Sequence, residues 1–406
     1  MIHLSGATVV QPAGLLSPAT LTIDGDRIAE IASRRTPSSG GIDLRDHYIV
    51  PGFVDVHVHG LAGVDSLDGR GAIAQIAQRL PRHGVTAFCP TSVACDPQSL
   101  RTLLDAVASA RATAPAGHAR VLPAHLESNF INPRFKGAQP ESCLRAPRTA
   151  VDGDFSGEDI LREIERGRAD VGIITVAPEI DGVLELIPGF VRNGHHVSVG
   201  HSGADYEQGL AAVAAGVRHA THLFNRMSTF SHRDPGLVGA VLDSDEVAAE
   251  LICDGVHVHP AAVRIAVAAK SPSRIMAITD GTAGAGLPPG ARATLGGRTI
   301  TVRDAAYLDD GTLAGSVLTM ERAFAQLVTR IGFSLVDAAL MCATTPAREM
   351  GLQGAGALVP GALADLVVLD RNLNVVETYV AGVRVFSRAD GFRHNGHKDH
   401  QEHEWP

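Results

Sequence analysis

The chain has 406 residues, 45% of them hydrophobic and 19% charged, which is typical of a globular protein with one large domain, alone or beside a smaller one. A net charge of −9 without any basic block argues against binding to nucleic acid or anionic lipid. No signal-peptide pattern and no apolar run of about 18 residues is present, and the five scattered cysteines fit reduced thiols, so we expect a cytoplasmic protein that does not enter a membrane.

Short segments of alternating apolar and polar residues occur at both ends of the chain and are typical of antiparallel strands. The segments are residues 7–10, 19–23, 27–31, 42–44 and 48–50 near the start, and 364–369, 375–380 and 383–386 near the end. Together they predict a small β-sandwich domain built from residues 1–50 and 349–390. Residues 391–406 are polar, with a histidine every third residue from His394 to His403, and predict a disordered tail or, alternatively, a weak metal site.

The middle of the chain, residues 51–348, alternates strand patterns with Ala/Leu-rich helical patterns. The expected strands are residues 53–58, 85–91, 121–126, 171–176, 196–199, 219–223, 247–252 and 275–279. Helical patterns between them include residues 72–82, 99–112, 159–166 and 206–215. Eight such repeats over about 290 residues predict an α/β fold, a TIM (β/α)8 barrel, whose active site lies at the carboxyl ends of the strands.

Polar residues that can bind metals or carry protons follow most of the expected strands. His57 and His59 are two residues apart on one strand, so their side chains point to the same side. Alone, such a pair could equally be two hydrogen-bonded surface histidines. Packing gives no reason, however, for six strands to end in His, Glu or Asp. The residues are His57 and His59, Glu127, His201, His222, Asp254 with His257, and Asp280.

The chemistry of this set favours a pair of metal ions. Four imidazoles, with the carboxylates of Glu127 and Asp280, suit Zn²⁺, Fe²⁺, Mn²⁺ or Co²⁺ and suit Ca²⁺ poorly. Six ligands exceed the need of one tetrahedral ion with an open position, so we expect two divalent ions bridged by Glu127. Such a pair activates water near neutral pH and polarises a carbonyl group. Asp280 is then placed to take a proton from the nucleophile and return it to a leaving nitrogen.

Ten short motifs run through nearly the whole chain. They are Pro51-Gly-Phe-Val-Asp55, His125-Leu-Glu127, Ala177-Pro-Glu179, Gly200-His-Ser202, Thr221-His-Leu-Phe-Asn225, Pro235-Gly-Leu237, Asp254-Gly-Val-His257, Thr279-Asp-Gly281, Leu313-Ala-Gly-Ser316 and Thr344-Thr-Pro-Ala347. Together they resemble the motifs of the amidohydrolase superfamily, and more closely those of the N-acetylglucosamine-6-phosphate deacetylases. The resemblance implies hydrolysis of the N-acetyl amide of an amino-sugar phosphate, with Zn²⁺ or Fe²⁺ as the metals. It implies Glu127, His201 and His222 as core metal ligands and Asp280 as the catalytic acid/base. Since some members lack the His-x-His pair and hold one metal, His57 and His59 make the chain similar to the two-metal members.

The resemblance also implies a set of substrate-binding residues. The set is Ala138, Asn225, Arg226, Arg233, Asp254, His257, Leu313, Ala314 and Gly315. Arg233 matches an arginine that binds the phosphate across a subunit interface, which implies a homodimer, and its alternative is a solvated loop arginine. An arginine suits this task because its guanidinium donates forked, charge-assisted hydrogen bonds.

Three positions depart from the family pattern and leave the substrate open. Ser128 and Asn129 stand where the family usually has Gly-Pro, and Arg226 stands where it usually has a small residue. The galactosamine epimer, another N-acyl compound without phosphate, or a deaminase substrate are the alternatives. No lysine lies between Lys136 and Lys270, which excludes the carboxylated lysine that bridges the metals of hydantoinase and dihydroorotase relatives. A scaffold protein on an inactive barrel would have lost ligands, whereas this chain keeps all six.

Overall fold

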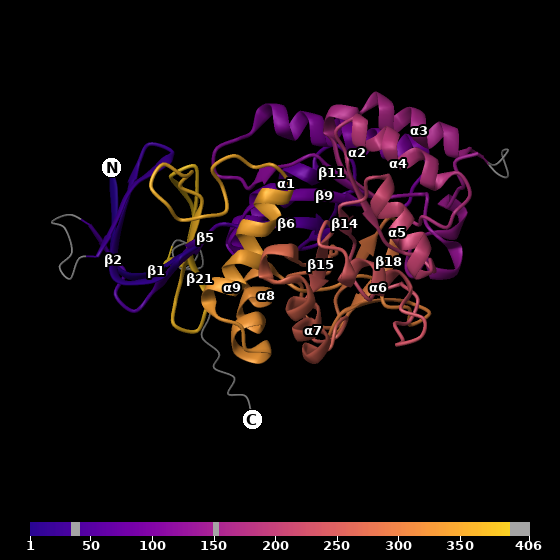
Figure 1. Ribbon diagram of the computed structural model, residues 1–406. Helices are drawn as coiled ribbons and strands as arrows, with labels where there is room; N and C mark the ends of the chain where they lie inside the picture. The colour runs from indigo at the N-terminus through magenta and orange to yellow at the C-terminus, as the bar shows by residue number, and fades with distance from the viewer. Residues whose placement is uncertain (34–40, 149–153, 390–406) are drawn as a thin grey trace.

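The structure is a computed structural model that describes residues 1–33, 41–148 and 154–389, so the predicted tail at 391–406 lies outside the described residues (Figure 1). Most of the chain forms a barrel of strands surrounded by helices, and a smaller β domain stands at one side of it (Figure 1). Among the described residues, no helix has the length and apolar character needed to cross a membrane.

Eight parallel strands form the barrel, as the sequence predicts. They are β6 (Phe53–Val58), β9 (Val85–Ser92), β11 (Ala124–Glu127), β12 (Val171–Val176), β13 (His196–Val199), β14 (His219–Ala220), β15 (Ala248–Ile252) and β16 (Ile275–Ile278). β6 pairs with β9, and the barrel closes where the backbone N–H of Asp280 donates to the carbonyl of His57 at 3.0 Å. Most of these strands are buried along their whole length, because helices cover the outside of the barrel.

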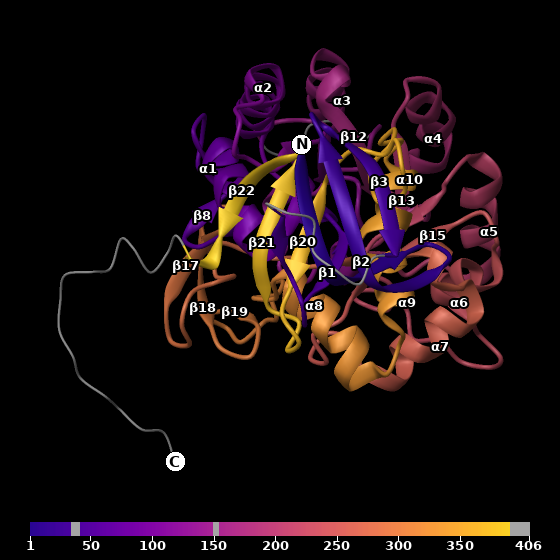
Figure 2. The same cartoon turned by 90° about the vertical axis from the view of Figure 1, so that its left-hand side faces the viewer.

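The helices surround the barrel, and α1 to α7 follow one another around it in chain order (Figure 2). They are α1 (Ala72–Arg79), α2 (Pro97–Thr113), α3 (Gly157–Arg166), α4 (Val183–Arg192), α5 (Tyr206–Ala215), α6 (Gly236–Asp243), α7 (Pro260–Lys270), α8 (Met320–Gln326), α9 (Leu335–Ala339) and α10 (Thr345–Glu349). Side-chain caps fix where several begin. The carboxylate of Asp96 accepts from two backbone N–H groups at the start of α2, and Ser156 with Asp159 forms a capping box at α3.

Two strands are shorter than predicted by more than one residue, each for a local reason. The third barrel strand starts at Ala124 instead of Val121, because Pro123 lacks the N–H that a central strand needs; residues before it form β10 (Arg120–Val121) beside β9. β14 ends at Ala220 instead of Leu223, because His222 adopts a positive φ of 30° and turns the chain out of the strand.

The small β domain joins the two ends of the chain in one sheet, with the order β22-β21-β20-β5-β1-β2-β3 and with β4 beside β1. Its strands are β1 (Ile2–Gln11), β2 (Gly14–Asp24), β3 (Arg27–Ser33), β4 (Ile42–Asp43), β5 (Tyr48–Pro51), β20 (Leu366–Leu369), β21 (Val375–Val380) and β22 (Val383–Ser387). Figure 2 shows the strands of the two ends side by side.

This sheet folds over on itself, since the N–H of Ile28 donates to the carbonyl of Ala362 at 2.9 Å and that of Ala364 to Asp26 at 2.8 Å. The fold encloses a second core that includes Leu21, Ile49 and Tyr379. The predicted fold class, a barrel with a small β domain from both ends, is therefore confirmed. We propose that the two domains meet near residues 51 and 349, where β5 and α10 end.

A three-stranded sheet between β16 and α8 is not predicted by the sequence. It consists of β17 (Arg292–Leu295), β18 (Arg298–Val302) and β19 (Ala306–Leu308). Leu295 and Ile300 pack with Val93, which follows β9, so this sheet lies against the carboxyl end of the barrel. A short hairpin of β7 (Gly60–Leu61) and β8 (Val64–Asp65) lies on the same side, directly after His59.

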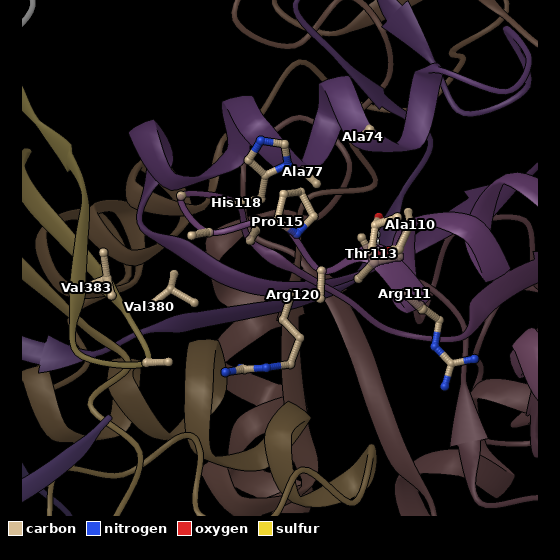
Figure 3. Close-up of a pocket in the computed structure, with 16 residues that line it drawn as sticks. Ala74, Ala77, Ala110, Arg111, Thr113, Pro115, His118, Arg120, Val380 and Val383 are labelled. Atoms are coloured by element: carbon tan, nitrogen blue, oxygen red, sulfur yellow. Dashed lines mark hydrogen bonds between the residues drawn. The ribbon is translucent and has the colours of Figure 1, made fainter. Parts of the chain in front are cut away.

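A cavity of about 290 Å³ lies between α1, the end of α2 and the β21–β22 hairpin, away from the residues at the carboxyl ends of the barrel strands that the sequence singles out (Figure 3). Its walls are mainly alanine, proline and valine side chains. The arginines at its edge already have acidic partners, because Arg111 pairs with Asp170, and Arg120 lies 2.8 Å from Asp365. None of the predicted site residues lines this cavity, so we look for the active site elsewhere.

Candidate active site

The six predicted metal ligands meet at the carboxyl end of the barrel. They lie in or just after five strands: His57 and His59 at β6, Glu127 at β11, His201 at β13, His222 at β14 and Asp280 at β16. All six are buried, and none is more than 7% exposed. Residues more than 200 positions apart in the chain therefore share one small interior space.

Glu127, His201 and His222 form the first group of three potential ligands. The Oε1 atom of Glu127 lies 2.7 Å from Nε2 of His201 and 2.8 Å from Nε2 of His222. The two Nε2 atoms are 3.1 Å apart. Three ligand atoms that converge in this way can bind one divalent cation.

His57, His59 and Asp280 form the second group. The Nε2 atoms of the two histidines are 3.1 Å apart, and Oδ1 of Asp280 lies 3.4 Å from His57 and 3.3 Å from His59. The second oxygen of Glu127 lies 3.5 Å from Nε2 of His59, so this carboxylate stands between the two groups.

The hydrogen bonds behind two histidines decide which ring nitrogen faces the centre. Nδ1 of His201 lies 2.8 Å from the carbonyl oxygen of Phe135, which can only accept, so Nδ1 carries the proton. Nδ1 of His57 likewise donates to the carboxylate of Glu250 at 2.9 Å. Nε2 of His201 then faces Glu127 and Nε2 of His222, and Nε2 of His57 faces Asp280 and Nε2 of His59. With Nδ1 bonded away from the centre, Nε2 is the nitrogen of each ring that can bind a divalent cation, so the donor set fits a metal.

Three of the ligands are held in backbone conformations that non-glycine residues rarely adopt. His201, His222 and Asp280 have φ values of 48°, 30° and 47°. Each turns the chain sharply after its strand and directs the side chain toward the barrel axis. Such strain is often concentrated at functional sites.

Electrostatics keep both carboxylates ionised. Burial opposes the charged form, but His57 and His59 outweigh it and hold the pKa of Asp280 below its usual value. His201 and His222 hold the pKa of Glu127 well below its usual value in the same way. Burial also opposes the protonation of His57, yet Asp280 and Glu250 raise the pKa of His57 to about 10. An ionised Asp280 is able to accept a proton.

A narrow cavity opens above the two groups. Most of the predicted substrate residues line it: Ala138, Asn225, Arg226, His257, Leu313 and Gly315. Asp254 stands behind His257, with Oδ2 2.6 Å from Nδ1. Nε2 of His257 is buried and has no hydrogen-bond partner among the described residues, which leaves it free for a ligand in the cavity.

Other predicted residues lie away from this cavity. Ala314 packs into the core under the inserted sheet, and Arg233 is exposed in the loop before α6. Ser128 and Asn129, two of the three departures from the family pattern, are buried and bond to backbone carbonyls: Ser128 to Thr175 at 2.6 Å, Asn129 to both Cys95 and Cys143 at 2.7 Å. Only Arg226 among the three departures lines the cavity.

Two polar residues of the site are not among those singled out from the sequence. The side chain of Gln139 donates to Glu127 and accepts from the N–H of Ala94 at 2.7 Å. Glu250 lies behind His57 with no exposed surface. A glutamate inside the apolar strand β15 is a signal that the sequence contains, whereas nothing in the sequence marks Gln139.

Comparison with known proteins agrees with this geometry. The model of the amidohydrolase family matches residues 48–385. The N-acetylglucosamine-6-phosphate deacetylase of Danio rerio is 38% identical over 361 residues, 86% of each chain, and that of Bacillus subtilis is 32% identical over 372 residues, 89% of this chain and 91% of the relative.

Solved structures give the same result. A variant of the N-acetyl-D-glucosamine-6-phosphate deacetylase of Mycobacterium smegmatis, in complex with N-acetyl-D-glucosamine-6-phosphate, has a TM-score of 0.86 and 33% identity over 95% of this chain and 99% of that one. The enzyme of Thermotoga maritima has a TM-score of 0.83 and 30% identity over 95% and 100%.

The barrel and the two groups of ligands define a metal-dependent hydrolase. The chain belongs to the amidohydrolase family and, within it, to the N-acetylglucosamine-6-phosphate deacetylases.

Proposed function

We propose that this protein hydrolyses the N-acetyl amide of N-acetylglucosamine-6-phosphate to glucosamine-6-phosphate and acetate. One observation carries the proposal: a single cavity is lined by residues of both ligand groups, among them the ionised Asp280, and by His257 with its free Nε2. This is what an amide hydrolase requires, because the reaction needs an activated water, a proton carrier and a group that orients the substrate. The relatives named above carry the same activity in their names.

We infer that two divalent ions, Zn²⁺ or Fe²⁺, bind at the two groups, with Glu127 shared between them. The short Nε2–Nε2 distance within each group and the position of Glu127 support this number. When bound, such ions lower the pKa of water and polarise a carbonyl.

The protein's own residues move the proton and hold the substrate. Asp280 accepts a proton from the attacking water and delivers it to the amine as the C–N bond breaks. Asp254 orients His257 through a hydrogen bond to Nδ1, so that Nε2 contacts the substrate. Residues that line the space for the sugar phosphate are Ala138, Asn225, Arg226, Leu313 and Gly315.

Arg233 supports the proposal of a homodimer. It is exposed on the loop between β14 and α6 and lies outside its own cavity, as an arginine that serves the neighbouring subunit would. A monomer with full activity in analytical ultracentrifugation would rule out this role. The cytoplasm is the proposed location, since all five cysteines are unpaired.

The galacto epimer, or another N-acyl compound, is the alternative substrate. Arg226 favours this alternative. It stands at a position where the family usually has a small residue, and its side chain packs against Gly137 and lines the cavity. A second anionic group on the substrate, or a different sugar configuration, would use this guanidinium.

Acetate release from four sugars tests both possibilities. We expect the metal-loaded protein to act on N-acetylglucosamine-6-phosphate far faster than on the unphosphorylated sugar, with the galacto pair as comparison. Asp280→Asn should lower kcat by at least about 10³-fold while the metal content stays unchanged, because an amide cannot carry the proton. Asp309→Asn, on an exposed residue, is the matched control. Turnover by Asp280→Asn at the rate of the control would refute the mechanism.

A further inference from the structure

Glu250 is a buried carboxylate at the point where the two ligand groups meet. It lies in β15, whose other residues are all apolar, and its side chain has no exposed surface. Its Oε2 atom lies 2.9 Å from Nδ1 of His57 and 3.2 Å from the backbone N of His222. One oxygen thus touches a residue of each of these two groups, while Glu250 itself belongs with His57 and His125 to a third, fully buried group of potential ligands.

The bond to His57 fixes the chemistry of its ring. Because a carboxylate oxygen only accepts, the proton of the neutral imidazole stays on Nδ1, and Nε2 presents its lone pair toward His59 and Asp280. Carboxylates in this position orient a histidine ligand and make it more basic.

The bond to His222 holds a strained turn. His222 has a φ of 30°, and its N–H donates to the side chain of Glu250 while the next N–H, of Leu223, donates to the Glu250 carbonyl at 2.9 Å. The side chain and the backbone of Glu250 therefore both accept hydrogen bonds from the loop that carries His222. Without them, the turn loses the acceptors that compensate for its conformation.

The other oxygen of Glu250, Oε1, has no hydrogen-bond partner among the described residues. This oxygen is 3.7 Å from Nδ1 of His125, and that nitrogen already donates to the carbonyl of Val56 at 3.0 Å. The other nitrogen of His125 is 2.8 Å from the hydroxyl of Thr175. No substrate reaches this space, because Glu250 and His125 are both fully buried and neither lines the cavity.

We propose that Glu250 is a positioning residue that couples the two metal positions by orienting His57 and the turn of His222 at the same time. It rests on the proposed function only in that both groups bind divalent ions. Removing the charge of Glu250 then weakens metal binding at both groups, and most strongly at the group of His57, where the contact is to the ligand ring itself.

Zinc affinity of Glu250→Gln, measured by chelator competition without any sugar, tests the proposal. Gln keeps the shape and one acceptor but loses the charge, and we expect affinity to fall by about 10- to 100-fold. The matched control is Asp365→Asn, another buried carboxylate, which precedes β20 in the β domain, pairs with Arg120 of β10 and should leave affinity unchanged. Equal affinity of Glu250→Gln and wild type, or an equal loss in both variants, overturns the proposal.

A spectroscopic measurement separates positioning from a general loss of packing. In the zinc-loaded wild type, the Nδ1 proton of His57 should give a downfield resonance typical of a bond to a carboxylate, and Glu250→Gln should move it upfield. An unchanged resonance overturns the proposal. If Glu250→Gln does not fold, Glu250→Asp replaces it: the shortened carboxylate should lower zinc affinity, and wild-type affinity in that variant overturns the proposal. If the wild-type protein releases no acetate, the proposed function is refuted, but the effect of Glu250 on zinc affinity is still measured, because that experiment uses no sugar.

Discussion

Thr279 anchors the end of the last barrel strand, one residue before Asp280. Its hydroxyl donates to the carboxylate of Asp55 at 2.6 Å and accepts from the N–H of Gly281 at 3.1 Å. Asp55 is completely buried, and Thr279 is its only side-chain hydrogen-bond donor among the described residues. The substitution Thr279→Val keeps the shape of the side chain and removes both hydrogen bonds.

The expected loss follows from the two groups that are left without a partner. A hydrogen bond to a charged group contributes about 1.5–3 kcal/mol, and a buried N–H without an acceptor costs about 1–3 kcal/mol. Thr279→Val should therefore lower the free energy of unfolding by about 3–5 kcal/mol. Burial raises the pKa of Asp55 to about 7, and Thr279 opposes this shift, so the full effect requires a pH at which Asp55 is ionised.

Urea unfolding of the metal-free protein at about pH 8 measures this difference. Thr378→Val is the matched control, because the buried hydroxyl of Thr378 donates only to a neutral acceptor, the carbonyl of Pro81 at 2.7 Å. That variant should lose about 1 kcal/mol. Equal losses for the two variants would refute the reasoning, since the charge on Asp55 would then make no difference.

Three further predictions concern the metal site and the base of the barrel. Gln139→Ala removes the hydrogen bond that Gln139 donates to Glu127, and it should lower kcat for acetate release about 10- to 100-fold. The control Gln98→Ala, at an exposed position, should leave kcat unchanged. Glu349 is half-buried, which disfavours its charge, but His219 and Arg348 beside it lower its pKa to about 2. Its charge therefore stabilises the fold above the ordinary pKa of 4.5, and this effect is lost as the pH falls through about 2. After screening, Glu349→Gln should cost about 2 kcal/mol near neutral pH and nothing near pH 2 in acid-series unfolding; a constant difference would contradict the assignment. Removing the metals with a chelator should cost about 4 kcal/mol for each ion whose free concentration is about 1,000 times its Kd, visible as a lower Tm, and an unchanged Tm would argue against metal at the site.

The sequence predicts the barrel well and marks the residues that the structure brings together as potential ligands, because both depend on local patterns. Strands β6, β12 and β13 have the predicted bounds, since their apolar runs are bounded by turn residues. Ligands such as His57 and Asp280 stand out because polar residues at strand ends have no packing role. The short alternating segments 292–308 are hard to distinguish from a loop, so the inserted sheet is missed.

Contacts between distant segments could not be predicted in the same way. The bond from His57 to Glu250 spans 193 positions, and only the closed barrel brings the two together. The positive φ values of His201, His222 and Asp280 also leave no mark in the sequence, since non-glycine residues occupy them. Ser128 and Asn129 show the limit of resemblance: they differ from the family pattern but bond to backbone, so sequence alone does not place them outside the cavity.

The sheet shared by the two chain ends has a consequence for synthesis on the ribosome. β5 pairs with β20, and their partners, such as Ile49 and Val368, are about 320 residues apart in the chain. At about 5–20 residues per second, β5 emerges roughly 15–60 s before the strand that covers it. During that time its open edge is available to other nascent chains. The whole barrel has to be translated before the small domain is complete. The sheet is therefore completed only when β20 to β22, the last strands to be made, are added and β20 pairs with β5.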